Sequence, residues 1–185
     1  LEGMVDIYPP RRALAVSQDR LVEKDFLSDL GLTTAPYADV TTAGELATLL
    51  PNFGGGILKT RRFGYDGKGQ IRVGAEDDPA EAFLALEGAP AILEGIVAFA
   101  CEISVIAARD QDGRSACFDP GENVHEAGSL RTTSVPAGVP ARVRADAVLA
   151  AGQILNALDY VGVLGVEFFV SPGGLVVNEI APRVH

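Results

Sequence analysis

Apolar residues at helical spacing predict a helix over residues 17–30. The apolar positions of this segment share one face: Val22, Phe26, Leu27 and Leu30. Ser17 can cap the first turn through its hydroxyl, and Gly31 can end the helix in a left-handed conformation. We therefore expect one side of this helix to be buried.

Three later segments show the same periodicity. Thr42 and Glu45 have the spacing of a capping box, and we expect Pro51 to end the helix that they begin. A short helix is predicted over residues 79–86. The longest helix is predicted over residues 142–158, where the apolar positions are Val148, Ala151, Leu155 and Leu158.

Short apolar or alternating runs predict strands, and two pairs of them have the pattern of hairpins. Segments 57–60 and 70–73 flank a glycine-rich loop, whereas segments 163–170 and 175–178 flank the turn at 171–174. Further strands are expected over 91–94, 102–108 and 115–118.

Helices interspersed with hairpin-connected strands indicate an α+β fold with mainly antiparallel sheets. The 185 residues, 48% of them hydrophobic, suit one domain or two small lobes that share a cleft. Residues 119–141 are rich in glycine, proline and polar side chains, which predicts a long connection without strands.

The charge and the cysteines exclude several function classes. With 15 basic and 25 acidic side chains, the formal charge of −10 would repel a phosphate backbone, so no nucleic acid partner is expected. No apolar run reaches the roughly 18 residues of a membrane helix, and no signal peptide pattern is present, so we expect no membrane partner and a cytoplasmic location. Cys101 and Cys117 lie apart in apolar stretches, which predicts buried, reduced thiols.

A glycine-rich loop is the first candidate for chemistry. Residues 62–69 lie between two predicted strands, whereas a Walker loop or a dinucleotide-binding loop would open a helix. Backbone N–H groups freed by glycine, together with Lys59 and Lys68, could close over a triphosphate. The alternative is a glycine-rich hairpin with no more than a surface role.

The last hairpin is the second candidate. Glu167 lies in an apolar strand, and Asn178 and Glu179 end its partner, so the short turn brings three oxygen-bearing side chains together. Two carboxylates and an amide suit Mg²⁺, which takes oxygen ligands and shares its remaining positions with phosphates. The alternative is a pair of charged residues at the surface of a sheet.

Other polar residues extend the candidate site. Glu94 follows the apolar run 91–93, and Glu102 lies on the next predicted strand. A backbone segment at a strand end can recognise adenine while a carboxylate accepts from a ribose hydroxyl. The alternative is that both glutamates are simply solvated. His125 lies in the polar connection, where it is either a ligand contact or a surface histidine. Arg183 and His185 could hold an anion near the metal.

Three strings together resemble one family. They are Lys59-Thr-Arg-Arg-Phe-Gly-Tyr-Asp-Gly-Lys-Gly-Gln70, Glu122-Asn-Val-His125 and Asn178-Glu-Ile-Ala-Pro-Arg-Val-His185. In content and order these strings are similar to those of the N5-carboxyaminoimidazole ribonucleotide synthetases of the ATP-grasp superfamily. The resemblance covers about residues 17–185. It implies two lobes with flanking helices that enclose a nucleotide cleft.

The resemblance implies roles by matching position. Arg20 and Lys59 would contact ATP. The segment that would close over the phosphates consists of Gly64, Tyr65, Asp66, Gly67, Lys68, Gly69 and Gln70. The adenine linker would consist of Glu94, Gly95, Ile96 and Val97. Glu102 would bind the ribose, while His125, Asn178 and Glu179 would line the nucleotide site.

The metal and the acceptor substrate follow from the same resemblance. Glu167 and Glu179 would hold Mg²⁺, and Tyr65, Asp66 and Arg183 would serve the acceptor and bicarbonate side. The implied reaction converts bicarbonate and ATP to carboxyphosphate, which carboxylates aminoimidazole ribonucleotide in purine biosynthesis. The implied full-length protein is a homodimer.

The resemblance also suggests boundaries and a departure. We expect residues 1–16 to be a remnant of a preceding domain or linker, 17–97 to form the first lobe and 98–185 the second, with a C-terminal domain absent. The linker at 94–97 is one residue shorter than is usual in the family. Because the backbone makes the main contacts there, this difference should matter little.

Two other functions are consistent with these residues. One is a different ATP-grasp ligase, such as a formate-dependent glycinamide ribonucleotide transformylase or a biotin carboxylase, although residues 65–70 and 182–185 match these less well. The other is a nucleotide-binding module without turnover. The retention of Lys59, Glu167 and Glu179 argues against the second, because buried charge is costly to keep.

Overall fold

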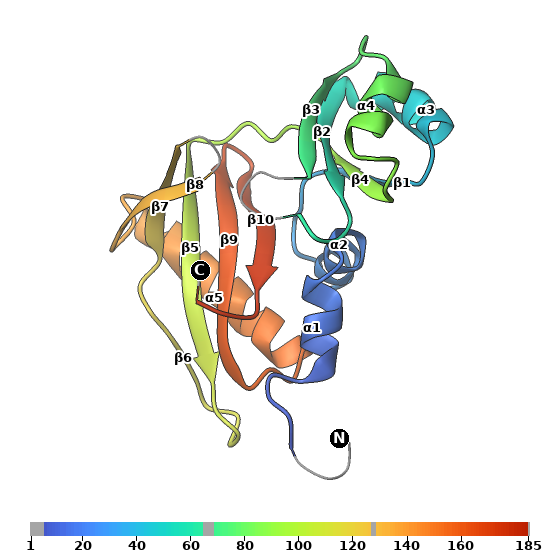
Figure 1. Cartoon of the computed structure of the whole chain (residues 1–185). Coiled ribbons are helices and arrows are strands. Elements are labelled where there is room, and N and C mark those ends of the chain that lie inside the picture. The colour runs from blue at the N-terminus through green and yellow to red at the C-terminus, as the bar shows by residue number, and fades with distance from the viewer. Residues whose placement is uncertain (1–5, 65–68, 127–128, 185) are drawn as a thin grey trace.

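A computed structural model of the chain describes residues 6–64, 69–126 and 129–184. Two mainly antiparallel sheets, each with helices on one face, form two layered units that lie side by side (Figure 1). The α+β fold class is confirmed. The domain boundaries at 16/17 and 97/98 stay predictions.

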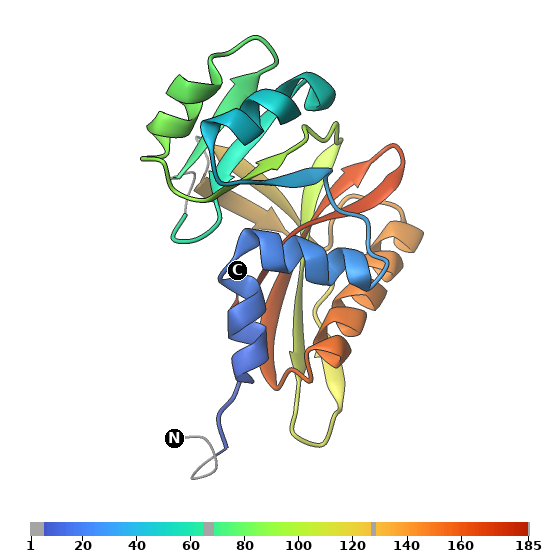
Figure 2. The same ribbon diagram turned by 90° about the vertical axis from the view of Figure 1, so that its right-hand side faces the viewer.

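The smaller sheet has four strands in the order β1-β4-β2-β3. In that order they are Tyr37–Val40, Ala91–Glu94, Gly55–Thr60 and Gln70–Gly74. Two helices pack on one face of this sheet, α3 (Ala43–Phe53) and α4 (Pro79–Ala85) (Figure 2). Their apolar side chains meet those of the sheet in a separate core that includes Val40, Leu46, Leu50, Leu58 and Leu93.

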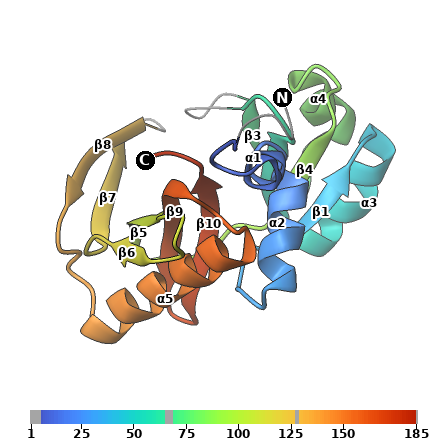
Figure 3. The same ribbon diagram turned by 90° about the horizontal axis from the view of Figure 1, so that it is seen from below.

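The larger sheet has six strands, five of them in the order β10-β9-β5-β7-β8, with β6 paired to β5. They are β5 (Cys101–Arg109), β6 (Ser115–Cys117), β7 (Gly121–Glu126), β8 (Ser129–Ser134), β9 (Gly162–Ser171) and β10 (Gly174–Ala181). The long helix α5 (Ala141–Ala157) covers one face of this sheet (Figure 3). The opposite face carries Glu102 and Glu167, which alternate with core residues of β5 and β9.

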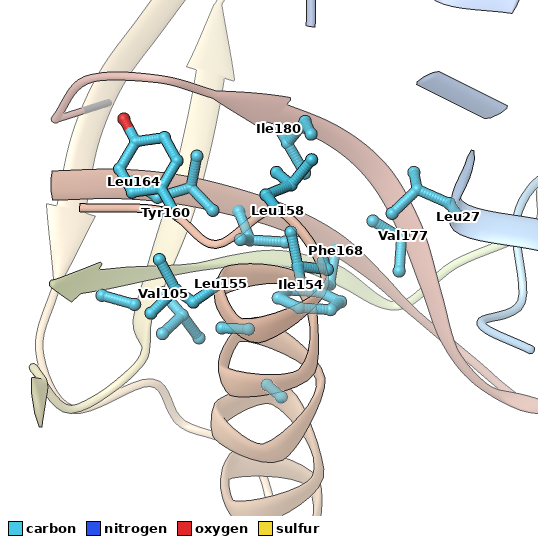
Figure 4. Packing of buried hydrophobic residues seen from close by; sticks show 14 of the residues in the cluster. Leu27, Val105, Ile154, Leu155, Leu158, Tyr160, Leu164, Phe168, Val177 and Ile180 are labelled. Carbon is cyan, nitrogen blue, oxygen red and sulfur yellow. The ribbon is translucent and has the colours of Figure 1, made fainter. Parts of the chain in front are cut away.

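The main core forms between α5 and the larger sheet. Ile154 and Leu155 of α5 point toward Val105, Leu164 and Phe168 on the strands (Figure 4). Each of these side chains is almost completely buried, and burying a large apolar side chain contributes about 1.5–3 kcal/mol. This core fixes which residues of β5 and β9 face away from the helix.

Two N-terminal helices complete the larger core. They are α1 (Arg11–Ser17) and α2 (Arg20–Asp29), and Val16, Phe26 and Leu27 from them join the same apolar cluster. Helix α2 lies between the two sheets (Figure 1). Its polar residues therefore lie close to both.

The beginning of the first predicted helix is wrong. Ser17 ends α1, and α2 begins with Asp19 as its N-cap, whose side chain accepts a hydrogen bond from the backbone N–H of Leu21. A carboxylate is a strong N-cap, so the chain breaks between the two helices. Val22 is 39% exposed, and α2 buries Phe26 and Leu27 instead.

Pro51 does not end its helix, contrary to the prediction. The capping box of Thr42 and Glu45 is present as expected, but α3 continues through Pro51 to Phe53. The burial of Leu50 and the left-handed Gly54 at the C-cap outweigh the loss of one N–H donor at proline.

The long connection predicted over residues 119–141 is also wrong, because the segment contains β7 and β8. These strands pair with each other, and β7 pairs with β5. Every residue of β8 is exposed, so it has no apolar alternation for the sequence to reveal. β8 is extended because it pairs with β7, and not because one of its faces is buried.

The remaining predicted elements are observed within one or two residues of their expected ends, except that β10 continues three residues beyond the predicted end at Asn178. Cys101 and Cys117 are free but only partly buried. Within the described ranges, no helix combines the length and the apolar character needed to cross a bilayer.

Candidate functional site

Glu167 and Glu179 are direct neighbours across the β9–β10 ladder. Val166 and Phe168 on either side of Glu167 belong to the core, so the Glu167 side chain points to the opposite face of the sheet. Paired residues on antiparallel strands have Cβ atoms about 4.5–5.5 Å apart. The hairpin therefore brings the two predicted metal carboxylates together on the face away from α5.

Asn178 joins this pair through a bulge. The register of β10 shifts between Val177 and Glu179, and the Asn178 amide Nδ2 donates to Glu167 Oε2 at 3.3 Å. The three oxygen-bearing side chains predicted from the hairpin are thus adjacent.

The chemistry of these donors fits Mg²⁺. Two carboxylates on one sheet face offer hard oxygen ligands, and Mg²⁺ commonly takes one or two carboxylates and completes its shell with waters and phosphates. No cluster of three or more histidine, cysteine, aspartate or glutamate side chains with metal-binding geometry occurs in the part of the chain that the structure describes. Two carboxylates would leave the other positions around the ion for water and phosphate oxygens.

Glu102 and His125 form a second polar pair on the same face of the sheet. Their strands are adjacent, and His125 Nδ1 lies 3.0 Å from Glu102 Oε2. Burial and the negative charge of Glu167 raise the pKa of Glu102, whereas His125 acts in the opposite direction. A partly buried carboxylate fixed by an imidazole is a suitable acceptor for ligand hydroxyl groups.

Lys59 and Glu94 pair on the smaller sheet. Lys59 Nζ lies 2.9 Å from Glu94 Oε2, and Glu94 ends β4 with only 4% of its surface exposed. The chain then continues through Gly95, Ile96 and Val97 to the larger sheet. The N–H of Gly95 donates to the carbonyl of Pro36, which fixes the start of this linker.

The linker ends beside an aromatic stack that the sequence did not predict. Phe99 and Phe169 stack with ring centroids 4.5 Å apart and an angle of 17° between the planes. Both Ile96 and Phe99 are partly exposed. These apolar surfaces beside backbone polar groups are suited to a flat heterocyclic ring.

Arg20 ties helix α2 to the glycine-rich loop. Its guanidinium donates to the carbonyls of Thr60 and Gly64, at 2.9 and 3.4 Å. Gly69 and Gln70 continue the hairpin, since Thr60 N–H donates to the Gly69 carbonyl and Gln70 pairs with Lys59. The predicted residues Tyr65, Asp66, Gly67 and Lys68 lie outside the described residues.

A cavity of about 350 Å³ opens between α2, the glycine-rich loop and the end of β10. Three arginines and two glutamates, Glu23 and Glu179, are among the residues that line it. The lining residues are Ser17, Gln18, Arg20, Glu23, Arg61, Arg62, Phe63, Gly64, Glu179 and Ile180. This combination suits an anion that is accompanied by a cation.

Arg183 is exposed, and its Nη1 donates to the carbonyl of Val184. The structure thus gives it a local contact beyond the end of β10. His185 lies outside the described residues.

Glu23 and Lys24 contribute to the site and were missed in the sequence. Lys24 Nζ donates to the Asn178 carbonyl at 2.7 Å and lies 3.8 Å from Glu94 Oε2, while Glu23 accepts from the N–H of Ile180. A signal was available, because both charged residues precede Leu27 by three or four positions and so share its buried face.

Comparison with known proteins places the chain in a family. A model of the ATP-grasp domain matches residues 25–185. The chain belongs to the ATP-grasp family.

Several relatives of this ATP-grasp chain are N5-carboxyaminoimidazole ribonucleotide synthases. Over 183 residues it is 52% identical to the N5-carboxyaminoimidazole ribonucleotide synthase of Brucella melitensis, with 97% of this chain and 51% of that protein covered. The crystal structure of N5-carboxyaminoimidazole ribonucleotide synthetase from Thermus thermophilus is similar with a TM-score of 0.91 and 43% identity, and the match covers all of this chain and 50% of that one.

A third relative has ligands bound. The N5-carboxyaminoimidazole synthase of Aspergillus clavatus, in complex with ADP and 5-aminoimidazole ribonucleotide, has a TM-score of 0.88 and 28% identity over 98% of this chain and 48% of that one. This ATP-grasp chain thus spans about half the length of the relatives that it matches.

Proposed function

We propose that this chain is the ATP-binding part of an ATP-dependent ligase that carboxylates 5-aminoimidazole ribonucleotide with bicarbonate to give N5-carboxyaminoimidazole ribonucleotide. The observation that carries the proposal is the register of Glu167 against Glu179 at the cavity beside the glycine-rich loop. The names of the relatives support the choice of substrate.

The adenosine half of ATP would lie at the linker between the sheets. Backbone groups of residues 94–97 would recognise the base edge, with Phe99 beside it, and Glu102 would accept from a ribose hydroxyl while His125 fixes its carboxylate. Lys59 pairs with Glu94 there, and its ammonium would also contact a phosphate.

The triphosphate would extend toward the cavity. Arg20, which lines the cavity, and Lys59 would supply positive charge, and Gly64 to Gln70 would close over the phosphates with their N–H groups. Glu167 and Glu179 would hold Mg²⁺, with Asn178 beside them, and the ion would neutralise phosphate charge as it builds during transfer. Preorganised charge of this kind lowers the barrier without reorganisation of solvent.

The residues that would bind the acceptor substrates are proposed only from their positions in the sequence. Tyr65, Asp66 and Arg183 would hold bicarbonate and the ribonucleotide close to the transferred phosphoryl group. Transfer to bicarbonate would give carboxyphosphate, and the exocyclic amine of the ribonucleotide would then take the carboxyl group with release of phosphate. We propose a homodimeric, cytoplasmic protein as the full assembly.

Calorimetric titration with ADP, with and without Mg²⁺, tests the nucleotide site. We expect Mg²⁺ to strengthen binding, and we expect Glu179→Ala to abolish this gain because one of two metal carboxylates is lost. Glu76→Ala, an exposed carboxylate in the turn after β3, is the matched control and should bind as the unchanged protein does. Equal Mg²⁺ dependence in Glu179→Ala would refute the metal assignment.

Phosphate release tests the reaction itself. We expect the carboxylated ribonucleotide to form, with release of phosphate, only when ATP, bicarbonate and 5-aminoimidazole ribonucleotide are all present. Release that is stimulated by formate in place of bicarbonate would overturn the proposed substrate.

A further inference from the structure

Two adjacent side chains of α2 contact the backbone on either side of Glu179. Lys24 Nζ donates to the carbonyl of Asn178, the residue before Glu179, at 2.7 Å. The N–H of Ile180, the residue after it, donates to Glu23 Oε1. The peptide groups that flank the proposed metal carboxylate are thus both bonded to one helical turn.

The strand itself leaves these two groups without a ladder partner. β10 is the edge strand of the larger sheet, with β9 as its neighbour. In an antiparallel ladder, alternate residues direct their N–H and C=O groups away from the neighbouring strand, and here Asn178 and Ile180 bond outward to α2. The bulge between Val177 and Glu179 further loosens the ladder at this point.

Both side chains are held in an environment that is costly for charge. Glu23 and Lys24 are 4% and 1% exposed. Burial, together with the charge of Glu179, raises the pKa of Glu23 to about 8, and burial lowers the pKa of Lys24. Apolar residues would fill this space at lower cost, so packing alone does not explain the pair.

Lys24 also connects this strand to the other sheet. Its ammonium lies 3.8 Å from Glu94 Oε2, at the end of β4 where the proposed adenine linker begins. The same side chain therefore contacts the proposed metal strand and the proposed adenosine site.

We propose that Glu23 and Lys24 are positioning residues that fix the backbone around Glu179 and so aim its carboxylate at the metal of a bound nucleotide. This inference rests on the proposed function, because Glu179 needs a Mg²⁺-nucleotide to bind. Outer-shell partners of metal ligands change metal affinity about 10–100-fold when they are removed. Glu23 and Lys24 act in this way through the backbone.

Two substitutions of Glu23 separate its acceptor role from its charge and volume. Glu23→Met keeps the length of the side chain but accepts no hydrogen bond, whereas Glu23→Gln keeps a carbonyl acceptor for the Ile180 N–H. Leu155→Ala weakens the same core from α5 and serves as a control for lower stability alone.

The first readout is ADP affinity with and without Mg²⁺. We expect Glu23→Met to lower the gain in affinity from Mg²⁺ by about tenfold or more, with metal-free affinity little changed. Glu23→Gln and Leu155→Ala should keep the gain. The second readout is hydrogen exchange at the Ile180 amide without nucleotide, which should be about tenfold faster in Glu23→Met than in Glu23→Gln.

Lys24→Met gives an independent test, because it breaks the Asn178 contact while Lys59 still pairs with Glu94. We expect it to reduce the Mg²⁺ gain as well. Folded Glu23→Met or Lys24→Met proteins with an undiminished gain would overturn the inference and leave the proposed function intact. An unchanged protein that binds ADP equally with and without Mg²⁺ would overturn both.

Discussion

The ammonium of Lys59 lies 2.9 Å from the carboxylate of Glu94 on the neighbouring strand. Ile57 is the direct partner of Glu94 in the ladder, so Lys59, two residues on, reaches it diagonally. Glu94 also has Lys24 at 3.8 Å. One buried carboxylate thus compensates the buried ammonium of Lys24 and the partly buried ammonium of Lys59 at the junction of the sheets.

Glu94→Gln should be strongly destabilising. It leaves the buried Lys24 and the partly buried Lys59 close together without the carboxylate that pairs with both, and breaking a buried pair costs about 3–5 kcal/mol. The free energy of unfolding from urea titration measures this. The control is Glu126→Gln, whose pair with Arg131 is exposed and should contribute less than about 1 kcal/mol. A similar small loss in both variants would contradict the expectation.

Glu102→Ala should weaken binding of ADP but not of 2′,3′-dideoxy-ADP. A hydrogen bond from a ribose hydroxyl to a carboxylate contributes about 1.5–3 kcal/mol, which corresponds to at least tenfold in affinity. The dideoxy compound lacks the donor, so it should lose little. Calorimetry with both compounds forms a cycle that isolates the contact. Equal losses for both would assign Glu102 a structural role instead.

The pair of Asp19 and Arg61 should make stability depend on acid pH. Burial raises the pKa of Asp19, but the hydrogen bonds and the charge of Arg61, with contacts at 2.9 and 3.0 Å, outweigh burial and hold it below the ordinary 3.8. A lowered carboxyl pKa contributes stability that is present above the unfolded pKa and is lost as the pH falls through the folded one.

Asp19→Asn tests this linkage, because asparagine still caps α2 but carries no charge. At neutral pH we expect the variant to be less stable by about 1–3 kcal/mol. This difference should shrink as the pH falls below about 3.8 and through the lowered pKa of Asp19, since protonation removes the charge from the unchanged protein too. A difference that stays constant would argue against the ion pair as its cause.

Local sequence predicted the parts of the site that lie in hairpins. Glu167, Asn178 and Glu179 are joined by a short turn, so strand register alone brings them together. The pairing of Lys59 with Gln70 across the β2–β3 hairpin follows in the same way. A turn of a few residues leaves little freedom, which is why the spacing was informative.

Contacts between distant segments were not predictable in this way. Glu23 and Lys24 meet β10 more than 150 positions along the chain, and only the packing of α2 between the sheets brings them there. Strands β7 and β8 were missed for a related reason, because β8 is exposed throughout and owes its conformation to its partner. In both cases tertiary structure, and not local pattern, decides the outcome.

Gly56 allows the close approach of β2 to the end of β4, which gives a further test of the junction. A Cβ atom at this position would lie 2.5 Å from the carbonyl oxygen of Glu94 and 2.9 Å from Leu93 Cδ1, so the strands would have to separate. Gly56→Ala should therefore destabilise the fold by about 1–3 kcal/mol and weaken ADP binding through displacement of Glu94.

Gly44 supplies the matched control for this substitution. It is exposed in α3, where the nearest atom to a new Cβ would be Thr42 Oγ1 at 3.9 Å. Alanine has the higher helix propensity, so Gly44→Ala should stabilise the protein by about 0.5–1 kcal/mol. Urea unfolding of both variants then gives shifts of opposite sign. A loss in Gly56→Ala that leaves ADP affinity unchanged would separate the packing of β2 and β4 from the nucleotide site.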